Sequence, residues 1–321
     1  MRPPATRDSD KAQDSMTAPR NTHPTENAHG IGPARHPRLI SRRRLIGATL
    51  GAALATPVAI VTGYGYITKI EPGWVAIERV ELKLPQLHLA FDGFRLVQLS
   101  DIDMDNWMTG ERLRDVVRQT NDLKPDLIAI TGDFVTEHPI TSPLAALVPE
   151  LRQIAAPSGI FAVLGNHDHW TDPAAVRVAL GEANVTELRN TSRSIRRGEG
   201  ILHLAGVDDN WMGEAKLDPF LDQLPPDAGA ILLAHEPDFA DLSAPTGRFA
   251  LQLSGHSHGG QISLPLLGAP ILPPFGRRYP RGRYQVGQMI QYSNRGLGMV
   301  QPYGRFNCRP EIALFTLRAG G

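Results

Sequence analysis

The sequence predicts an α/β protein in which a sheet built from βαβ units is covered by helices. Apolar runs of the length of buried strands alternate with helical patterns between residues 94 and 182. Several of these runs end in a turn that carries aspartate, asparagine or histidine. The chain has 321 residues, of which 41% are apolar and 21% charged, so it is long enough for one large domain or two small ones.

The individual elements follow from the spacing of the apolar residues. Residues 75–84 alternate apolar and polar side chains, which predicts an edge or half-exposed strand, whereas residues 94–99 are more apolar. Residues 110–123 have apolar side chains at helical spacing, and Asp172 is a suitable cap for a helix that begins at Pro173. Further strands are expected at residues 126–130, 159–164, 186–190, 194–196, 201–207, 230–234 and 249–253, and further helices at residues 144–154 and 173–182.

The C-terminal third is expected to contribute a loop and two strands. Residues 288–292 and 311–317 are predicted to form a pair of strands that could close a second sheet. Between residues 264 and 283 lie five prolines and four arginines, which predicts a long ordered loop over the site. The arginines could bind a phosphate bidentately, but they are equally consistent with a solvated loop.

Charge and cysteine content exclude some classes of protein. Residues 1–44 contain nine lysines and arginines against four acidic residues, which leaves 24 against 29 for the remainder. A mildly acidic body argues against nucleic-acid binding by a broad basic surface. Because Cys308 is the only cysteine, neither an intrachain disulfide nor a cysteine metal cluster can form.

The N-terminal region is predicted to be a basic leader followed by a targeting segment. Residues 1–40 are rich in proline and lack an apolar period, so we expect disorder. Residues 41–70 contain Arg42 and Arg43 before an uncharged stretch, and they resemble a twin-arginine export signal. The alternative is a membrane anchor, since Leu45–Ile67 has 23 residues. Both alternatives place residues 71–321 outside the cytoplasm, and the first requires the twin-arginine export machinery as a partner.

Ligand-type side chains follow five of the predicted strands. His256 and His258 stand on a glycine-flanked turn after residues 249–254, and neutral imidazoles in such a turn are good ligands for transition metals. In an open α/β sheet, ligands bind beyond the carboxyl ends of the strands, so these side chains can converge on one crevice. The remaining candidates are Asp101, Asp103, Asp133, Asn166, His167, Asp168 and His235.

Three of these blocks, taken in order, resemble the calcineurin-like metallophosphoesterase superfamily. The blocks are Gly132-Asp133, Gly165-Asn166-His167-Asp168 and Gly255-His256-Ser257-His258, and the resemblance covers roughly residues 71–318. The leader and residues 264–298 and 305–312 are further similar to the bacterial subgroup that is exported by the twin-arginine route. The resemblance implies a four-layer αββα sandwich with a dinuclear metal site at the C-terminal ends of the strands.

The resemblance also implies a role for each site residue. Asp101, Asp133 and His258 would hold one metal and Asn166, His235 and His256 the other, with the Asp133 carboxylate bridging them. Two divalent ions about 3.5–4 Å apart need such a negative bridge, together with a shared hydroxide that is nucleophilic at neutral pH. The mixed ligands suit manganese, zinc or iron. His167 would protonate the departing oxygen or grip the phosphate, and Asp168 would orient His167.

One position departs from the family pattern. The family has histidine two residues after its first aspartate, whereas this chain has Asp103. Three outcomes remain open: Asp103 is a ligand that favours harder ions, it binds through water, or the first metal site is weak. Asp105 is an alternative donor, although a carboxylate in a turn more often caps the backbone.

The sequence therefore predicts an extracytoplasmic, metal-dependent phosphoesterase with two divalent ions and a metal-bridging hydroxide. Its substrate would be a phosphomonoester, a phosphodiester or a pyrophosphate, and an envelope lipid is one candidate. The alternative is a non-catalytic envelope protein with a degraded metal site, which only Asp103 indicates. The sequence does not indicate an oligomeric state.

Overall fold

The computed structural model describes residues 43, 61–136, 141–224, 226 and 229–320. The chain divides into two units, residues 1–54 and 55–321, and the fold below is that of the second unit. The predicted basic leader, residues 1–40, and most of the predicted signal or anchor, residues 41–70, lie outside the described residues. Among the helices that are described, none has both the length and the apolar character needed to cross a membrane.

One six-stranded sheet carries the βαβ units that the sequence predicts. Strands β2 to β5 run parallel in chain order, and β12 lies antiparallel to β2 and parallel to the edge strand β1. Register pairs Leu96 with Leu127 and Ile128 with Ile160, so the apolar residues of neighbouring strands share faces. The strands are β1 (Ala76–Leu84), β2 (Phe94–Leu99), β3 (Leu127–Thr131), β4 (Ile160–Val163), β5 (Thr186–Glu187) and β12 (Glu311–Ala319).

A second six-stranded sheet is assembled from later parts of the chain. Its four central strands, β7, β8, β9 and β11, are parallel, and an antiparallel strand closes each edge. The strands are β6 (Thr191–Arg197), β7 (Gly200–Gly206), β8 (Ala230–Leu233), β9 (Phe249–Ser254), β10 (Gly282–Val286) and β11 (Met289–Ser293).

Helices cover the outer face of each sheet. The helix α5 begins where Asp172 accepts hydrogen bonds from the amides of Ala174 and Ala175, as its sequence predicts. Against the first sheet pack α2 (Gly110–Asp122), α3 (Thr141–Leu151) and α5 (Pro173–Glu182), and α4 (Asn166–Thr171) precedes α5. Shorter segments cover the second sheet, namely α6 (Asp218–Leu221), η4 (Pro237–Phe239) and α7 (Ala240–Ser243).

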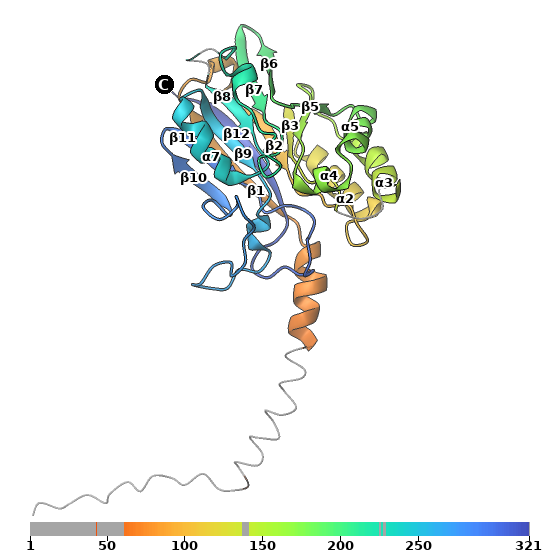
Figure 1. The fold of residues 1–321 in the computed structure, drawn as a ribbon. Coiled ribbons are helices and arrows are strands. Elements are labelled where there is room, and N and C mark those ends of the chain that lie inside the picture. Colours follow the sequence, from red (N-terminus) through yellow and green to blue (C-terminus); the bar gives the residue numbers. More distant parts are fainter. Residues whose placement is uncertain (1–42, 44–60, 137–140, 225, 227–228, 321) are drawn as a thin grey trace, which may run out of the picture. The chain divides into compact units, whose positions relative to one another are not determined.

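Three apolar cores separate the resulting four layers (Figure 1). The middle core joins the two sheets, and in it Leu96 and Phe315 of one sheet pack with Leu251 of the other. Burial of these side chains is the main force that holds the sheets face to face. The predicted αββα sandwich is therefore confirmed.

Some predicted elements were wrong in detail. The two C-terminal strands do not pair with each other, since β11 enters the second sheet and β12 inserts between β1 and β2 of the first. Of the strand predicted at residues 186–190, only Thr186 and Glu187 form a strand, β5, which runs parallel to β4. The helix α4 and the strand β10 were missed because α4 has only six residues and β10 lies among prolines and arginines.

Candidate metal centre

The carboxyl ends of strands from both sheets meet at one place. Asp101 and Asp103 follow β2, Asp133 follows β3, and Asn166 and His167 open α4 directly after β4. The second sheet brings His235 after β8, and His256 and His258 after β9. The convergence that the strand ends predict is therefore present, with the carboxylates on one sheet and most of the imidazoles on the other.

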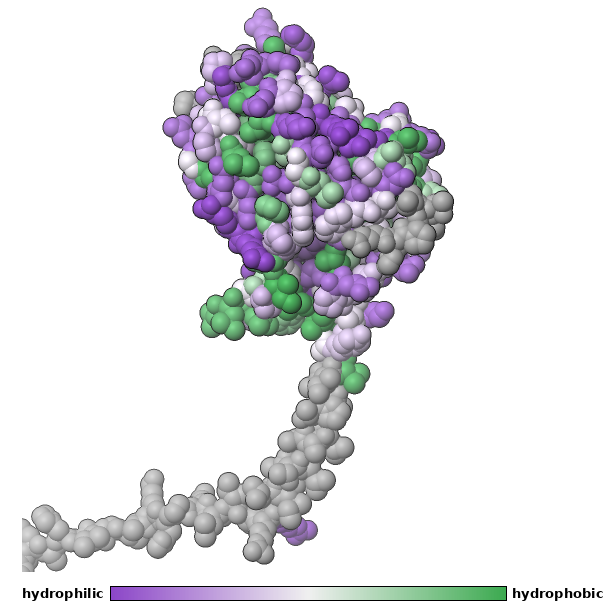
Figure 2. All heavy atoms as spheres, viewed as in Figure 1, coloured by the Kyte–Doolittle hydropathy of each residue, from purple (hydrophilic) through white to green (hydrophobic). Residues whose placement is uncertain are grey.

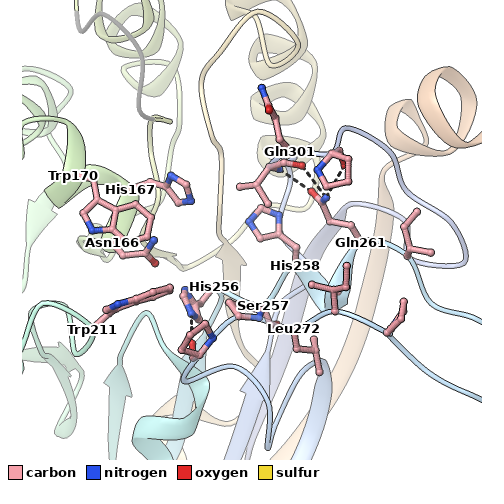
Figure 3. Close-up of a pocket in the computed structure, with 18 residues that line it drawn as sticks. Asn166, His167, Trp170, Trp211, His256, Ser257, His258, Gln261, Leu272 and Gln301 are labelled. Carbon is pink, nitrogen blue, oxygen red and sulfur yellow. Dashed lines mark hydrogen bonds between the residues drawn. The ribbon is translucent and has the colours of Figure 1, made fainter.

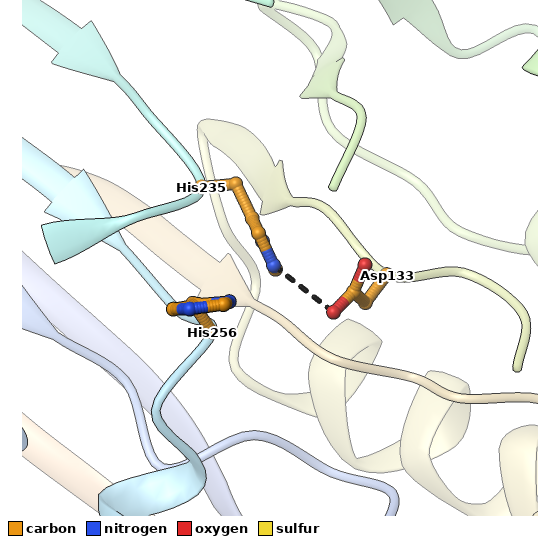
Figure 4. A group of neighbouring side chains, drawn as sticks. All are labelled: Asp133, His235 and His256. Atoms are coloured by element: carbon orange, nitrogen blue, oxygen red, sulfur yellow. Dashed lines mark ion pairs between the residues drawn. The ribbon is translucent and has the colours of Figure 1, made fainter. Parts of the chain in front are cut away.

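Asp133, His235 and His256 form the first group that could hold a metal ion (Figure 4). One ligand atom from each lies within 4.8 Å of the others, and all three residues are buried. The Nδ1 of His235 lies 2.7 Å from the carbonyl oxygen of Thr131 and must donate to it, which leaves Nε2 free, 3.0 Å from Asp133 Oδ2. The Nε2 of His256 lies 2.7 Å from the carbonyl of Pro274, so its Nδ1 is free.

Asp133 also belongs to a second group. Its ligand atom lies within 4.8 Å of those of Asp103 and His167. On the same side, His258 Nε2 lies 3.4 Å from Asp101 Oδ1 and 3.4 Å from Asp103 Oδ2. Asp133 therefore belongs to both groups, as expected of a carboxylate that bridges two metal ions.

Unpaired polar atoms show that the residues fit divalent ions. Buried polar atoms nearly always have a partner, and here a cluster of acceptors has none within the described part of the chain. Carboxylate, amide and imidazole donors of this kind suit manganese, zinc or iron. The unpaired atoms are Asp101 Oδ2, both carboxylate oxygens of Asp103, Asn166 Oδ1, His235 Nε2 and His258 Nδ1.

The electrostatics of the metal-free site favour the same conclusion. Burial, together with the charge of Asp133, raises the pKa of Asp101 to about 7 and that of Asp103 well above its ordinary value. Burial also lowers the pKa of His256 and His258, which keeps both imidazoles neutral. Burial opposes the ionisation of Asp133 as well, but the charges of His235 and His167 hold its pKa below the ordinary value. The site therefore presents carboxyl groups whose ionised form a nearby positive charge would stabilise. It also presents neutral imidazoles that can bind a metal ion.

The backbone at these positions is held in a conformation that most residues avoid. Single non-glycine residues in the left-handed region cost on the order of 1 kcal/mol or more and persist where the surrounding structure dictates them, often at functional sites. At the candidate metal centre, five such residues lie two to four residues beyond the end of a strand. They are Asp101 (φ 47), Asp103 (φ 49), Asp133 (φ 55), His256 (φ 66) and His258 (φ 49).

His167 and Asp168 occupy different environments. The amide of His167 donates to Asp133 Oδ1 at 2.9 Å, while its ring packs edge-on against Trp170 and its Nδ1 is buried without a partner in the described chain. The Asp168 carboxylate instead accepts from the amides of Phe134 (2.8 Å) and Gly165 (3.0 Å). Asp168 therefore ties the Asp133 loop to the start of α4, and its contact with the His167 ring is indirect.

A cavity of about 480 Å³ opens beside the metal centre (Figure 3). Asn166, His167, His256 and His258 line it on the side of the strand ends. Its other walls are mostly apolar, and they come from Trp170, Trp211, residues 270–274 and residues 300–302. The predicted loop over the site is confirmed for residues 270–274, but no arginine is among the described residues that line the cavity.

Sequence reasoning missed several residues of the site. Trp211, on the loop between β7 and α6, packs edge-on against both Trp170 and His256. Arg305 is buried completely and donates to the carbonyls of Gly296 (3.2 Å) and Gly298 (2.6 Å), whose segment packs against Asp101 and Asp103. Arg305 falls in the stretch 305–312 that resembles the bacterial subgroup, but no spacing or motif marks it or Trp211 as a site residue, because both are brought to the site only by the fold.

Hydrogen bonds bear on two minor predictions. The Asp105 carboxylate accepts from the amides of Trp107 (2.7 Å) and Met108 (2.6 Å), which confirms its capping role. Of the four loop arginines, Arg278 is paired with Asp241 on α7, away from the cavity lining.

Comparison with known proteins identifies the family. The model of the calcineurin-like phosphoesterase family matches residues 94–260. The chain belongs to this family. It is a metal-dependent phosphoric ester hydrolase, as the sequence predicts.

Three relatives illustrate the range of the family. The Bacillus subtilis (strain 168) protein described as the uncharacterized metallophosphoesterase YkuE is 38% identical over 282 residues, which cover 87% of this chain and 98% of YkuE. The phosphodiesterase YaeI of Escherichia coli (strain K12) is 31% identical over 87% of this chain and 100% of its own length. The UDP-2,3-diacylglucosamine pyrophosphatase LpxG of Chlamydia trachomatis is 27% identical over 84% of this chain and 96% of its own length.

A glycine substitution tests how closely the site is packed. A Cβ on Gly165 would lie 2.3 Å from Asp133 Oδ1 and 2.7 Å from His235 Nε2, although the backbone there (φ −117) accepts any residue. Gly165→Ala should therefore displace both candidate ligands and weaken metal binding by about 10- to 100-fold, measured by calorimetric titration of chelator-treated protein. Gly181→Ala is the matched control, because nothing lies within 4 Å of its Cβ. Unchanged metal affinity in Gly165→Ala would show that the ions bind elsewhere.

The pKa shifts predict how the stability of metal-free protein depends on pH. Because burial raises the pKa of Asp101 to about 7, the folded state keeps a proton that the unfolded chain has already lost, so stability falls as the pH rises towards and through 7. The raised pKa of His235, due to Asp133, acts in the same direction, and the lowered pKa values of His256 and His258 oppose it only up to pH about 6.5. The thermal midpoint of chelator-treated protein should therefore fall from pH 6.5 to 8.5.

Added metal should remove this fall, since bound ions replace the protons on the carboxylates. Asp101→Asn, which carries no titrating group at that position, should show a shallower fall without metal. A midpoint that rises with pH in metal-free protein would contradict the electrostatic picture.

Proposed function

We propose that the protein hydrolyses a phosphate ester outside the cytoplasm at a centre of two divalent metal ions. The observation that carries the proposal is the place of Asp133, which belongs to both groups of residues that could hold an ion. Manganese, zinc and iron are the ions that the mixed donors favour. The proposed ligands are Asp101, Asp103, Asp133, Asn166, His235, His256 and His258.

The residues of this chain would divide the work of the reaction. When bound, two divalent ions lower the pKa of water and neutralise charge on the phosphoryl oxygens. Asp133 is oriented for its shared role by the amide of His167, and the imidazoles of His235 and His256 are fixed by backbone carbonyls. His167 lines the cavity with an unpaired ring nitrogen, so it can give a proton to the departing oxygen. Asp168 is a positioning residue that holds the His167 helix against the Asp133 loop.

The position of Asp103 favours an intact metal site. Both of its carboxylate oxygens are buried and unpaired in the described chain, and one lies 3.4 Å from His258. An anionic oxygen at this position supplies what the family histidine would supply as a neutral nitrogen, and it favours harder ions. These contacts support a ligand and weigh against the alternative of a degraded, non-catalytic centre.

The walls of the cavity support a substrate with an apolar part. Trp170, Trp211 and residues 270–274 face the space beside the metal centre, whereas the described lining contains no aspartate, glutamate, lysine or arginine. A monoester, a diester and a pyrophosphate fit the ligand set equally, because the ions meet only the phosphoryl group. LpxG, a relative that acts on a diacylated sugar nucleotide by its name, supports an envelope lipid phosphate as the substrate class.

The central test removes the negative charge of Asp133, which the two candidate metal sites share. Asp133→Asn keeps the shape of the side chain but not its negative charge, so it should reduce metal content and lower hydrolysis of a chromogenic phosphodiester by on the order of a hundredfold or more. His167→Ala is the contrasting variant, because it should keep both ions and lose on the order of a hundredfold in turnover. A fully active Asp133→Asn protein would place the centre elsewhere.

A second test addresses Asp103. If this carboxylate binds metal directly, Asp103→Ala should lose one ion per chain and most of the activity, and Asp103→His should shift the preferred ion towards zinc. The measurement is metal analysis of the three proteins purified under identical conditions. Two ions and full activity in Asp103→Ala would make Asp103 a bystander.

A third test concerns location. The proposed export by the twin-arginine route depends on Arg42 and Arg43, so changing both to lysine should leave folded protein in the cytoplasm. Fractionation of cells that express the two forms measures this, and the N-terminus of the exported form shows whether residues 41–70 are removed. Unchanged export of the lysine variant would exclude the route.

A further inference from the structure

We propose that residues 261–276 form a lipid-contact loop that seats the open side of the cavity on a membrane surface. The inference rests on the proposed location in the envelope but not on catalysis. Its occupant is a lipid bilayer, because the loop combines a protruding apolar tip, a basic border and a direct connection to the cavity.

The composition of the lipid-contact loop is the first observation. Its sixteen residues contain no charged side chain, and six of them are leucine or isoleucine. Leu264 and Gly268 exchange backbone hydrogen bonds of 2.8 and 2.9 Å, which close a tight hairpin. At the tip of this hairpin Leu266 is fully exposed and Leu267 is 81% exposed. Water-soluble surfaces rarely present contiguous apolar side chains in this way without a partner.

Backbone hydrogen bonds anchor the lipid-contact loop at its base. The amide of Ser263 donates to the carbonyl of Phe306 at 2.8 Å, and the amide of Phe306 donates to Gln261 at 2.9 Å. Leu266 lies in the left-handed region (φ 67), which is unfavourable for leucine. The structure therefore holds the apolar tip away from the protein at a conformational cost.

The N-terminal segment of the described unit joins the same anchor. The amide of Arg305 donates to the carbonyl of Ile67 at 2.9 Å, directly beside the pairing of Phe306 with the loop. Val61, Tyr64 and Ile70 on this segment are exposed, and Figure 2 shows hydrophobic residues gathered on this side of the molecule. The sequence is uncharged from Leu45 to Thr68, and Ile67, near the end of this uncharged stretch, lies next to the anchor of the loop.

A basic border follows the apolar stretch. Arg277 and Arg278 come directly after the loop, and both are exposed. The backbone amides of Arg277 and Arg278 donate to Asp238, and the side chain of Arg278, but not that of Arg277, pairs with Asp241 in the described chain. Apolar side chains next to exposed basic groups are typical of segments that lie in the interface of an anionic bilayer.

The loop also connects the proposed membrane surface with the reaction site. Pro270, Ile271 and Leu272 line the cavity that holds His256 and His258, and Ile271 is 76% exposed at its rim. A lipid phosphate could thus pass from the bilayer into the cavity along apolar side chains. The same loop would serve both contact with the membrane and choice of substrate.

The experiment places a probe on the tip of the loop in the full chain. Leu267→Cys is labelled with an environment-sensitive fluorophore, and Cys308 does not compete because it is completely buried. The matched control is Leu89→Cys, which is 79% exposed and lies before β2, at the opposite end of the strands from the site. Both proteins are mixed with vesicles of phosphatidylcholine and phosphatidylglycerol, with and without a quencher on the acyl chains.

The expected result is a blue shift and at least severalfold stronger quenching at residue 267 than at residue 89. Adding Leu266→Ser and Ile271→Ser to the labelled chain should reduce this quenching, whereas adding Val178→Ser, exposed on α5, should not. Equal quenching at residues 267 and 89, or none at either, overturns the proposal. A blue shift without vesicles that grows with protein concentration also overturns it, because a second copy of the chain would then cover the loop.

None of these readings uses activity. Loss of phosphodiester hydrolysis in Asp133→Asn tests the proposed function, and it leaves the quenching at residue 267 unchanged if the lipid-contact loop is correct. The two proposals can therefore fail separately.

Discussion

The constraint that governs this structure is the burial of several carboxylates at one edge of a sandwich. Asp101, Asp103 and Asp133 are almost fully buried, and their mutual repulsion adds to the cost of removing each from water. Arg305 is a buried cation, but its guanidinium already donates hydrogen bonds to backbone carbonyls. It therefore cannot pair with all three carboxylates. The arrangement becomes favourable only with added positive charge, which the two proposed divalent ions would supply.

Both sheets contribute side chains to this buried site. The first sheet provides the carboxylates and Asn166, and the second provides His235, His256 and His258. Closure of the middle core therefore brings acidic and imidazole groups together in the same step that buries Phe315 and its neighbours. Glycines at the strand ends make this approach sterically possible, and the candidate ligand positions share a left-handed backbone conformation.

The cavity combines two kinds of surface, which suggests how chemistry and selectivity are separated. The side that carries His167 and the proposed ligands is polar, and it would act on any phosphoryl group. The opposite walls come from Trp170, Trp211 and the lipid-contact loop, and these can change without altering the metal centre. Relatives named as a phosphodiesterase and as a pyrophosphatase are consistent with such a division.

The sequence by itself determined the βαβ pattern, the four-layer class and the set of candidate ligand positions, because each depends on local periodicity or on a short block such as Gly165–Asp168. It could not place β12 within the first sheet or β11 within the second, since strand order depends on long-range pairing. Trp211, Arg305 and the indirect role of Asp168 likewise emerged only from the tertiary structure. Their contacts join residues far apart in the chain, and only the packing of the two sheets decides which of these residues meet.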